Sequence, residues 1–259
     1  MNSSVKGGRV RHWPQVLLLI VAAMLVTPPA LGADAIYETS LISRVQTAFA
    51  ERPAGDAAEY HRICGTMLIY EIWQAWPSLS DQTRLALSSM APLERPPLDE
   101  MYDTPDGTFR IHFTRTGTHA INMTFGTGAG NVPVYILNCA GLLDRVYKKE
   151  VDTLGFRVPV PDQTRNPAED ARFDVYFQKL SSDFYGLTFP ESTVVSGGGQ
   201  PIRATSYMIL QSDFTRIPNY QNRPFDAMAV TIAHEFHHSS QWAYDAFEGE
   251  IRGQGNDLP

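Results

Sequence analysis

Long apolar runs are missing from this sequence of 259 residues. The longest unbroken run, Val16–Val26, has eleven residues, whereas a helix that spans a bilayer needs about 20. The run follows Lys6, Arg9 and Arg11 and precedes a stretch of small residues. This layout is typical of a secretory signal peptide. We therefore expect residues 1–32 to be removed on export to the periplasm or the medium; a membrane anchor is the alternative.

Cysteine is equally scarce, because the chain holds only Cys64 and Cys139. Zinc sites built from cysteine use closely spaced pairs, which these two residues do not form. Export would expose both thiols to an oxidising compartment, where a disulfide can persist. We expect a single bridge between Cys64 and Cys139, and two buried free thiols are the alternative.

Basic residues are outnumbered, with 21 Lys and Arg against 28 Asp and Glu. The expected signal peptide holds three of the basic residues and no acidic one, so the mature balance is 18 − 28 = −10. An acidic protein is repelled by nucleic acid and by anionic membranes. We therefore expect neither as a partner once the signal peptide is removed, and the sequence leaves the oligomeric state open.

Residues 33–95 have the pattern of a helical segment. Apolar residues recur there at mixed spacings of three and four, as in amphipathic helices. The expected helices span residues 36–49, 60–76 and 78–90. Ser80 or Asp81 is placed to cap the third helix, and the stretch 91–107, rich in Pro and Asp, marks a boundary. The segment is either a pro-segment or the flank of a single domain.

Residues 96–259 mix two periodicities. Alternating apolar and polar residues predict strands at 109–116, 172–180 and 204–214. Helical spacing predicts helices that run from about Pro133 to Val151 and from Phe225 to about Ala246. Residues 184–190 read as a turn or a short extended piece. This order predicts an α/β (α+β) fold with a mixed sheet, preceded by the helical segment.

The last expected helix carries the sequence His-Glu-Phe-His-His at residues 234–238, which fits the motif H-E-x-x-H. His234 and His238 are four residues apart, so they lie on one side of the helix and can bind one ion. Zinc is the natural candidate, because it binds imidazole nitrogen and favours few, tetrahedral ligands. Glu235 is expected to act as general base toward the water bound to the ion.

Other histidines are weaker candidates for chemistry. His237 follows His234 by three residues and is also within reach, but pairing these two would leave Glu235 badly placed, so we treat His237 as a neighbour of the site. His112 and His119 lie on or just after an expected strand, where histidine is more often structural. The alternative for the whole motif is a helix whose histidines are solvated or satisfied by core hydrogen bonds.

The stretch VTIAHEFHHSSQWAYD, residues 230–245, resembles the active-site helix of zincin metallopeptidases, and within them a family of secreted bacterial metalloproteases. The resemblance extends over about residues 95–248. It implies a zincin fold, a zinc site at His234 and His238, and Glu235 as the base. It also implies that the strand at 204–214 lies near the cleft, where an extended peptide substrate could pair with it.

The third zinc ligand is not evident in the sequence. A catalytic zinc site needs three protein ligands and one open position. Metzincins place a third histidine six residues after the second, where this chain has Tyr244, so the chain is gluzincin-like instead. Three accounts stay open: the ligand lies beyond residue 259 and the domain at 96–259 is incomplete, Glu248 or Glu250 completes the site, or the chain is an inactive relative.

These patterns together predict a secreted zinc metalloendopeptidase that hydrolyses peptide bonds of a polypeptide substrate with a zinc-activated water. The alternative belongs to a different class, an exported and non-catalytic zincin-like module that binds a metal or a partner. The sequence does not indicate the cleavage preference.

Overall fold

The computed structural model describes residues 35–50, 64–164, 170–181, 184–195, 200–217 and 219–247. The expected signal peptide lies outside these residues, as do the candidate ligands Glu248 and Glu250. Among the described residues, no helix is both long enough and apolar enough to cross a bilayer. All of them belong to one compact unit, residues 32–259.

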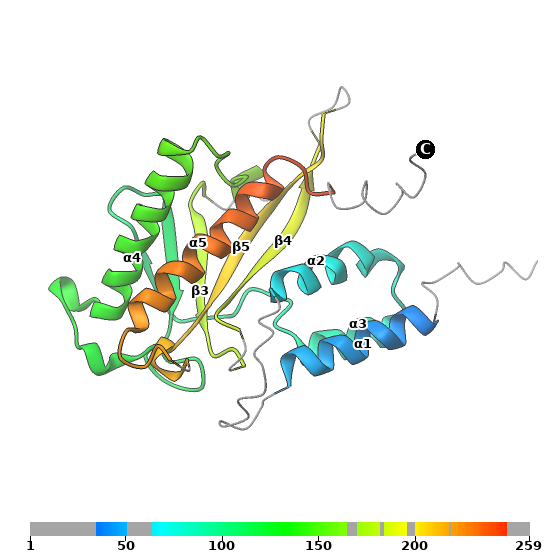
Figure 1. Cartoon of the computed structure of the whole chain (residues 1–259), viewed down its shortest axis with the longest axis horizontal. Coiled ribbons are helices and arrows are strands. Elements are labelled where there is room, and N and C mark those ends of the chain that lie inside the picture. The colour runs from blue at the N-terminus through cyan, green and yellow to red at the C-terminus, as the bar shows by residue number, and fades with distance from the viewer. Residues whose placement is uncertain are drawn as a thin grey trace, which may run out of the picture. The chain divides into compact units, whose positions relative to one another are not determined.

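A five-stranded mixed sheet is the centre of the fold, in the order β1-β2-β3-β5-β4 (Figure 1). The strands are β1 (Glu100–Asp103), β2 (Phe109–Phe113), β3 (Phe173–Gln178), β4 (Gly186–Val194) and β5 (Arg203–Gln211). β2, β3 and β5 are parallel, whereas β1 and β4 run antiparallel at the two edges. The predicted mixed α+β layout is therefore confirmed.

Two expected segments differ in extent or setting from the prediction. The strand expected at 204–214 is present as β5, which pairs with β4 on one side and, at Met208–Gln211, with β3 on the other. That an extended peptide pairs with this strand stays a prediction. Residues 184–190, expected as a turn or a short extended piece, open the longer strand β4 at the edge of the sheet.

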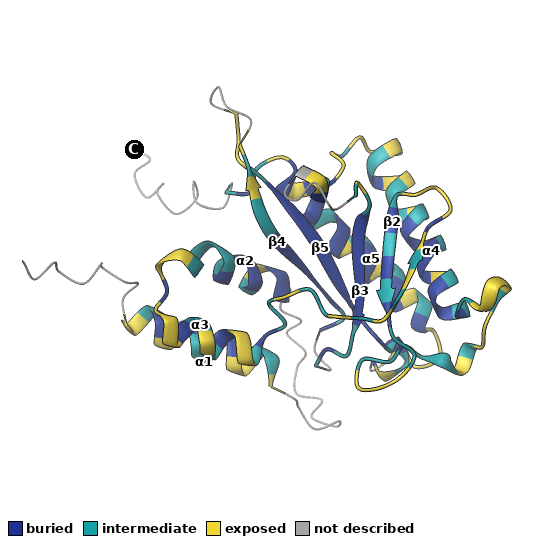
Figure 2. Ribbon diagram, turned by 180° about the vertical axis from the view of Figure 1, so that it is seen from behind, coloured by how far each residue is buried: buried dark blue, intermediate teal, exposed yellow. Residues whose placement is uncertain are grey.

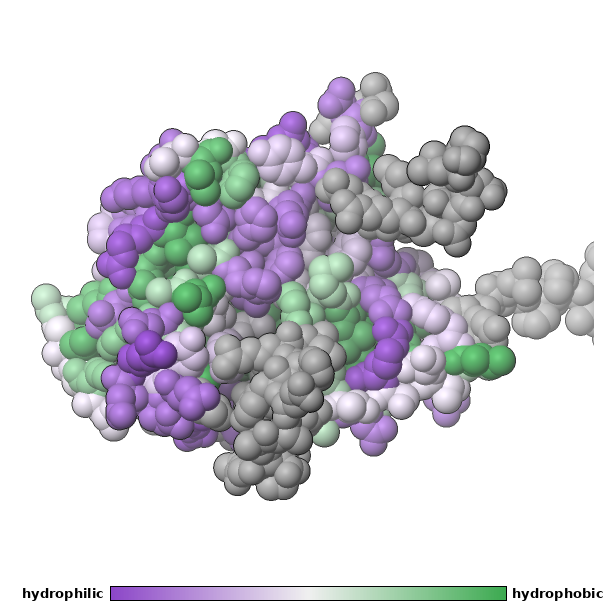
Figure 3. Space-filling view, in the orientation of Figure 1, coloured by the Kyte–Doolittle hydropathy of each residue, from purple (hydrophilic) through white to green (hydrophobic). Residues whose placement is uncertain are grey.

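Two helices pack on one face of the sheet, α4 (Val134–Tyr147) and α5 (Pro224–Trp242) (Figure 1). A π-helical turn, Lys148–Thr153, follows α4 directly. Alternate residues of β3 and β5 point to this face, and they share a buried core with the apolar sides of both helices. Figure 2 shows that β3, β4 and β5 are buried over most of their length. On the outer side of α4 and α5, hydrophilic and apolar side chains are interspersed (Figure 3).

The N-terminal helices are α1 (Ala35–Phe49), α2 (Gly65–Ala75) and α3 (Asp81–Met90), which confirms the expected helices over the described residues. They form a second core with the opposite face of β3, β4 and β5. Ser80 caps α3 as predicted, accepting a hydrogen bond from Thr83 N. Its hydroxyl also donates to the carboxylate of Glu38, which fixes α1 against the start of α3.

The expected disulfide is wrong, because Cys64 and Cys139 are both free. Cys139 lies on the buried side of α4 and is fully enclosed in the core, and burial raises the pKa of its thiol. Cys64 directly precedes α2 and contacts side chains of α5. A disulfide needs Cα atoms within about 7 Å of each other, a distance that the spacing of two cysteines in a sequence does not reveal.

Gly186 allows β4 to approach α5 closely, and replacing it is expected to destabilise the fold. A Cβ atom there would lie 2.7 Å from Thr231 Cγ2 and 2.8 Å from Glu235 Cγ. We expect Gly186→Ala to lower the free energy of unfolding by about 1–3 kcal/mol through overpacking, measured by urea denaturation. Gly141→Ala is the control, because a Cβ there meets nothing within 4 Å and lies inside α4. Equal stability of the two variants would contradict this account.

Candidate metal centre

The histidines of the H-E-x-x-H motif lie on the outer side of α5, because only one side of this helix packs against the sheet. Pro224 begins the helix, where its missing N–H costs nothing, and Asp226 places a negative charge in the first turn. Ile232 and Phe236 are buried in the core. The side chains of His234 and His238 therefore emerge together on the side away from that core, next to the start of α2.

Three ligand atoms meet at this point. His234 Nε2 and His238 Nε2 lie 3.2 Å apart, and Cys64 Sγ lies 3.2 Å from each of them. A tetrahedral zinc ion with bonds of about 2.0–2.1 Å to nitrogen and about 2.3 Å to sulfur separates such ligand atoms by about 3.3–3.6 Å. The triangle therefore has nearly the size that one ion requires. Among the described residues, these three form the group of side chains able to hold a metal ion.

The orientation of His238 also suits a metal ligand. Its Nδ1 lies 3.0 Å from Gln241 Oε1, one turn further along α5. An Nδ1–H that donates to this amide oxygen leaves the lone pair on Nε2, which faces Cys64 and His234. Such outer partners commonly fix the tautomer and the ring orientation of metal-binding histidines.

Cys64 is the member that sequence reasoning missed, because it was treated there as a disulfide partner. It is 170 positions from His234, so no spacing in the sequence links it to the motif. Its side chain makes no capping hydrogen bond at the start of α2, which leaves the thiol directed at the histidine pair. The sequence placed Cys64 inside the helix expected at 60–76, whereas in the structure it precedes α2.

The charges within the triad of Cys64, His234 and His238 favour the thiolate form of Cys64. Burial opposes ionisation of the Cys64 thiol, but hydrogen bonds and charge interactions with His234 and His238 outweigh it and lower the pKa of Cys64 to about 5. The hydrogen bond with Cys64 in turn raises the pKa of His234. The thiolate is the form of cysteine that binds metals, so the donor set of one sulfur and two nitrogens fits zinc.

Glu235 lies beside the pair but is directed into the protein. Only 4% of the residue is exposed, and its Oε2 accepts hydrogen bonds of 2.7 Å from the hydroxyls of Thr66 and Thr188. Burial raises the pKa of Glu235. Thr66 belongs to α2 and Thr188 to β4, so the carboxylate is held where α2, β4 and α5 meet.

The other histidines within the described residues make other contacts. His237 Nδ1 lies 3.5 Å from Glu150 in the π-helical turn, and burial raises the pKa of Glu150 to about 7. His112 Nε2 lies 2.8 Å from Asp174 on the neighbouring strand. His119 Nδ1 accepts the main-chain N–H of residue 179 at 3.2 Å. None of these three side chains joins the triad.

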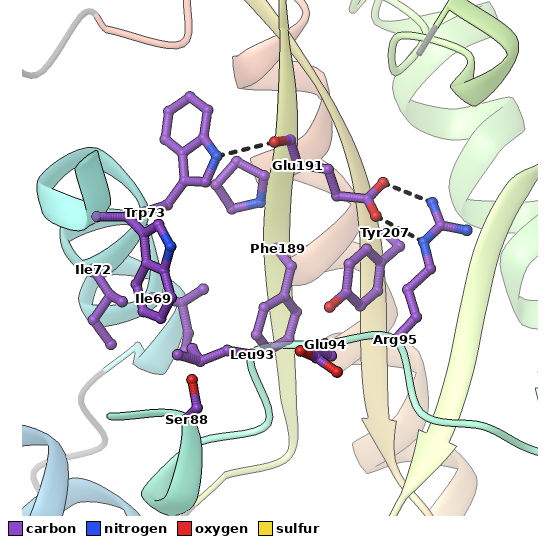
Figure 4. Close-up of a pocket in the computed structure, with 12 residues that line it drawn as sticks. Ile69, Ile72, Trp73, Ser88, Leu93, Glu94, Arg95, Phe189, Glu191 and Tyr207 are labelled. Atoms are coloured by element: carbon purple, nitrogen blue, oxygen red, sulfur yellow. Dashed lines mark hydrogen bonds and ion pairs between the residues drawn. The ribbon is translucent and has the colours of Figure 1, made fainter. Parts of the chain in front are cut away.

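A cavity of about 570 Å³ lies between α2 and the strands β4 and β5. Figure 4 shows Trp73, Phe189 and Tyr207 lining it, with Arg95 and Glu191 at one end. The Arg95 guanidinium is already bound by carboxylates of the protein, including Glu191 at 2.6 Å. None of the triad residues lines this cavity, so the groups suited to metal chemistry lie elsewhere.

A scan against protein-family models and searches of curated proteins and of solved structures find no match to this chain. The function is therefore inferred from the side chains around the motif and from the way the helices and strands position them. The candidate ligands Glu248 and Glu250 lie outside the described residues, so Cys64 is the third ligand atom that the described residues bring to the histidine pair.

Proposed function

We propose that the protein is a secreted zinc-dependent metallopeptidase with a zincin-like fold. The observation that carries this proposal is the pair of imidazole nitrogens of His234 and His238, 3.2 Å apart on one side of α5. A carboxylate, Glu235, is fixed next to that pair. Two histidines with an adjacent general base are the arrangement that H-E-x-x-H supplies in metal-dependent peptide hydrolysis.

The position of β4 also supports a peptide substrate. β4 is an edge strand next to α5, antiparallel to β5. An extended peptide can add to such an edge through main-chain hydrogen bonds, which orient it without demanding a particular sequence. The scissile bond of a peptide aligned on β4 would then lie beside the motif helix.

Several residues of the chain have separate roles in the proposed reaction. His234 and His238 would hold the zinc ion, which would serve as a Lewis acid toward water and the substrate carbonyl. Glu235 accepts the proton of the attacking water and passes it to the departing amine nitrogen. Thr188 holds the Glu235 carboxylate in place for both transfers, and Gln241 keeps His238 Nε2 free to bind the metal.

A non-catalytic module is the second candidate, and one observation favours it. Cys64 adds a third ligand atom to the two histidines, while Thr66 lies against the Glu235 carboxylate. Structural zinc sites are closed by four protein ligands, and the three described here leave one position open. The observation that favours a non-catalytic module is therefore the buried Glu235 carboxylate, which already accepts two hydrogen bonds. The two functions make different predictions for Glu235→Gln.

Zinc content tests the metal site directly. The purified chain is expected to hold about one equivalent of zinc at neutral pH, measured by atomic absorption. His238→Ala removes one nitrogen ligand and is expected to lose most of this zinc. His237→Ala is the matched control, because His237 lies on the same helix but contacts Glu150, and it is expected to keep the metal. A wild-type chain free of zinc, or equal zinc in both variants, would refute the site.

A further inference from the structure

The cavity between α2 and the strands β4 and β5 has the size of a small-molecule site. Its volume is about 570 Å³, and ligand pockets in proteins commonly have about 300–1,000 Å³. Figure 4 shows side chains of α2 on one side of it, and Phe189 of β4 and Tyr207 of β5 on the other. No residue of the metal triad lines this space, so its occupant is a separate question from the metal.

Four aromatic residues line the cavity: Trp73, Trp76, Phe189 and Tyr207. The rings of Phe189 and Tyr207 stack with their centroids 5.0 Å apart. The indole of Trp73 is fixed by a hydrogen bond of 3.2 Å from its Nε1 to the main-chain oxygen of Glu191. Aromatic rings bury the apolar body of a ligand, and their faces attract cations, those of Trp most strongly. This lining therefore suits a ligand that is both aromatic and positively charged.

The charges at the cavity also favour a cation. The ionisable residues that line it are Glu94, Arg95 and Glu191. The Arg95 guanidinium is bound by the carboxylates of Glu191 and Asp174, at 2.6 Å and 2.5 Å, so its single positive charge is more than offset. Glu94 is exposed and adds a further negative charge that is already in contact with solvent. The sum is negative, which attracts a cation and repels an anion.

We propose that this cavity binds an organic cation with an aromatic body. The positive group of the ligand lies near Glu94, and the aromatic body packs between Trp76 and Phe189. Arg84 also approaches this region, since it donates to the main-chain oxygen of Trp76, but Asp81 pairs with it and it does not line the cavity. The inference stands on the cavity alone and does not depend on the proposed peptidase function.

Thioflavin T tests the assignment, because it is a planar aromatic cation whose fluorescence rises when its rings are held rigid. The uncharged dimethylaminophenyl-benzothiazole with the same ring system is the matched neutral probe, and anilinonaphthalene sulfonate is the anionic one. Titration of the full chain at neutral pH is expected to give a Kd for thioflavin T about tenfold lower than that of either other probe. A cation over aromatic faces next to a carboxylate accounts for a preference of this size.

Two variants place the dye in the cavity. Glu94→Gln removes a charge at an exposed position and is expected to raise the Kd of thioflavin T about threefold to tenfold, with the Kd of the neutral probe unchanged. Asp99→Asn is the matched control, because Asp99 is also exposed and close in the chain but does not line the cavity. Trp76→Leu removes an indole and is expected to weaken thioflavin T about tenfold. Thermal unfolding verifies that each variant folds.

The results separate the proposed site from general attraction to the dye. Weaker binding in Glu94→Gln and Trp76→Leu, with Asp99→Asn unchanged, supports the site. Equal losses in Glu94→Gln and Asp99→Asn overturn it, because the net charge of the chain then attracts the dye. A Kd unchanged in both lining variants, or no binding by the wild type, also overturns it. Equal affinity for the neutral probe rejects the preference for a cation. If Trp76→Leu does not fold, Glu94→Gln with its control decides alone.

Discussion

Glu235→Gln is expected to lower the rate of peptide hydrolysis by about 10²–10⁴-fold, the usual contribution of a general base. An amide cannot take the proton of the attacking water, so this step loses its acceptor. The side-chain oxygen of glutamine can still accept the hydrogen bonds that Thr66 and Thr188 now donate. The geometry of the site is therefore expected to remain, and zinc content should equal that of the wild type.

The experiment separates chemistry from binding by measuring two quantities on one protein. Casein hydrolysis and zinc content are compared for Glu235→Gln and the wild-type chain. Glu150→Gln is the matched control, because it makes the same change at another buried glutamate, in the π-helical turn. The control should keep both its rate and its zinc.

Two results would contradict the assigned role of Glu235. A rate equal to that of the wild type would mean that another group takes the proton. Loss of zinc together with activity would mean that the carboxylate maintains the site and not the proton transfer. In a non-catalytic module, neither variant would change a measurable rate, and zinc would stay bound in both.

The local parts of this architecture were predictable from the sequence. Helix spacing identified α1, α3 and α5, and Ser80 was recognised as a cap because a short polar side chain before an apolar helix satisfies its free N–H groups. The convergence of His234 and His238 follows from a spacing of four residues on one helix. Each of these features depends on residues within one or two turns of one another.

The long-range parts were not predictable in the same way. The order β3-β5-β4 places β5 inside the sheet and β4 at its edge, an arrangement that depends on pairings between distant segments. Pro190 lies within β4, where proline is tolerated because the strand is at the edge of the sheet, so residues 184–190 open a longer strand than the turn or short extended piece expected. Cys64 meets the motif only because α2 packs on β4, so its role requires the tertiary structure.

Arg95→Met is expected to cause the largest loss of stability among these substitutions. Arg95 follows α3 in the chain, and its guanidinium is bound by Asp174 of β3, Glu191 of β4 and Asp162. Its side chain is 19% exposed, and those of the three carboxylates are 4–12% exposed. A methionine fills much of the same space but leaves these buried charges without their cation.

The expected cost is about 3–5 kcal/mol, as found when one partner of a buried ion pair is removed. Arg44→Met is the control, because Arg44 pairs with Glu71 at a more exposed position, where an ion pair contributes about 0–1 kcal/mol. Urea denaturation of both variants at pH 8 measures the difference. Losses of equal size would contradict the role of the buried cluster.

The loss of stability caused by Arg95→Met should also depend on pH, because the charge of Asp162 in this cluster depends on pH. Burial raises the pKa of Asp162 to about 7, against the opposing effect of Arg95. Above this pH the carboxylate is charged and needs the guanidinium, whereas at pH 5 it is protonated and the variant buries one unpaired charge fewer. Because the folded pKa of Asp162 lies above its unfolded value, its ionisation weakens the fold as pH rises through 7. The deficit of Arg95→Met relative to the wild type should therefore be larger at pH 8 than at pH 5, and a deficit independent of pH would exclude Asp162 from the cluster's energetics.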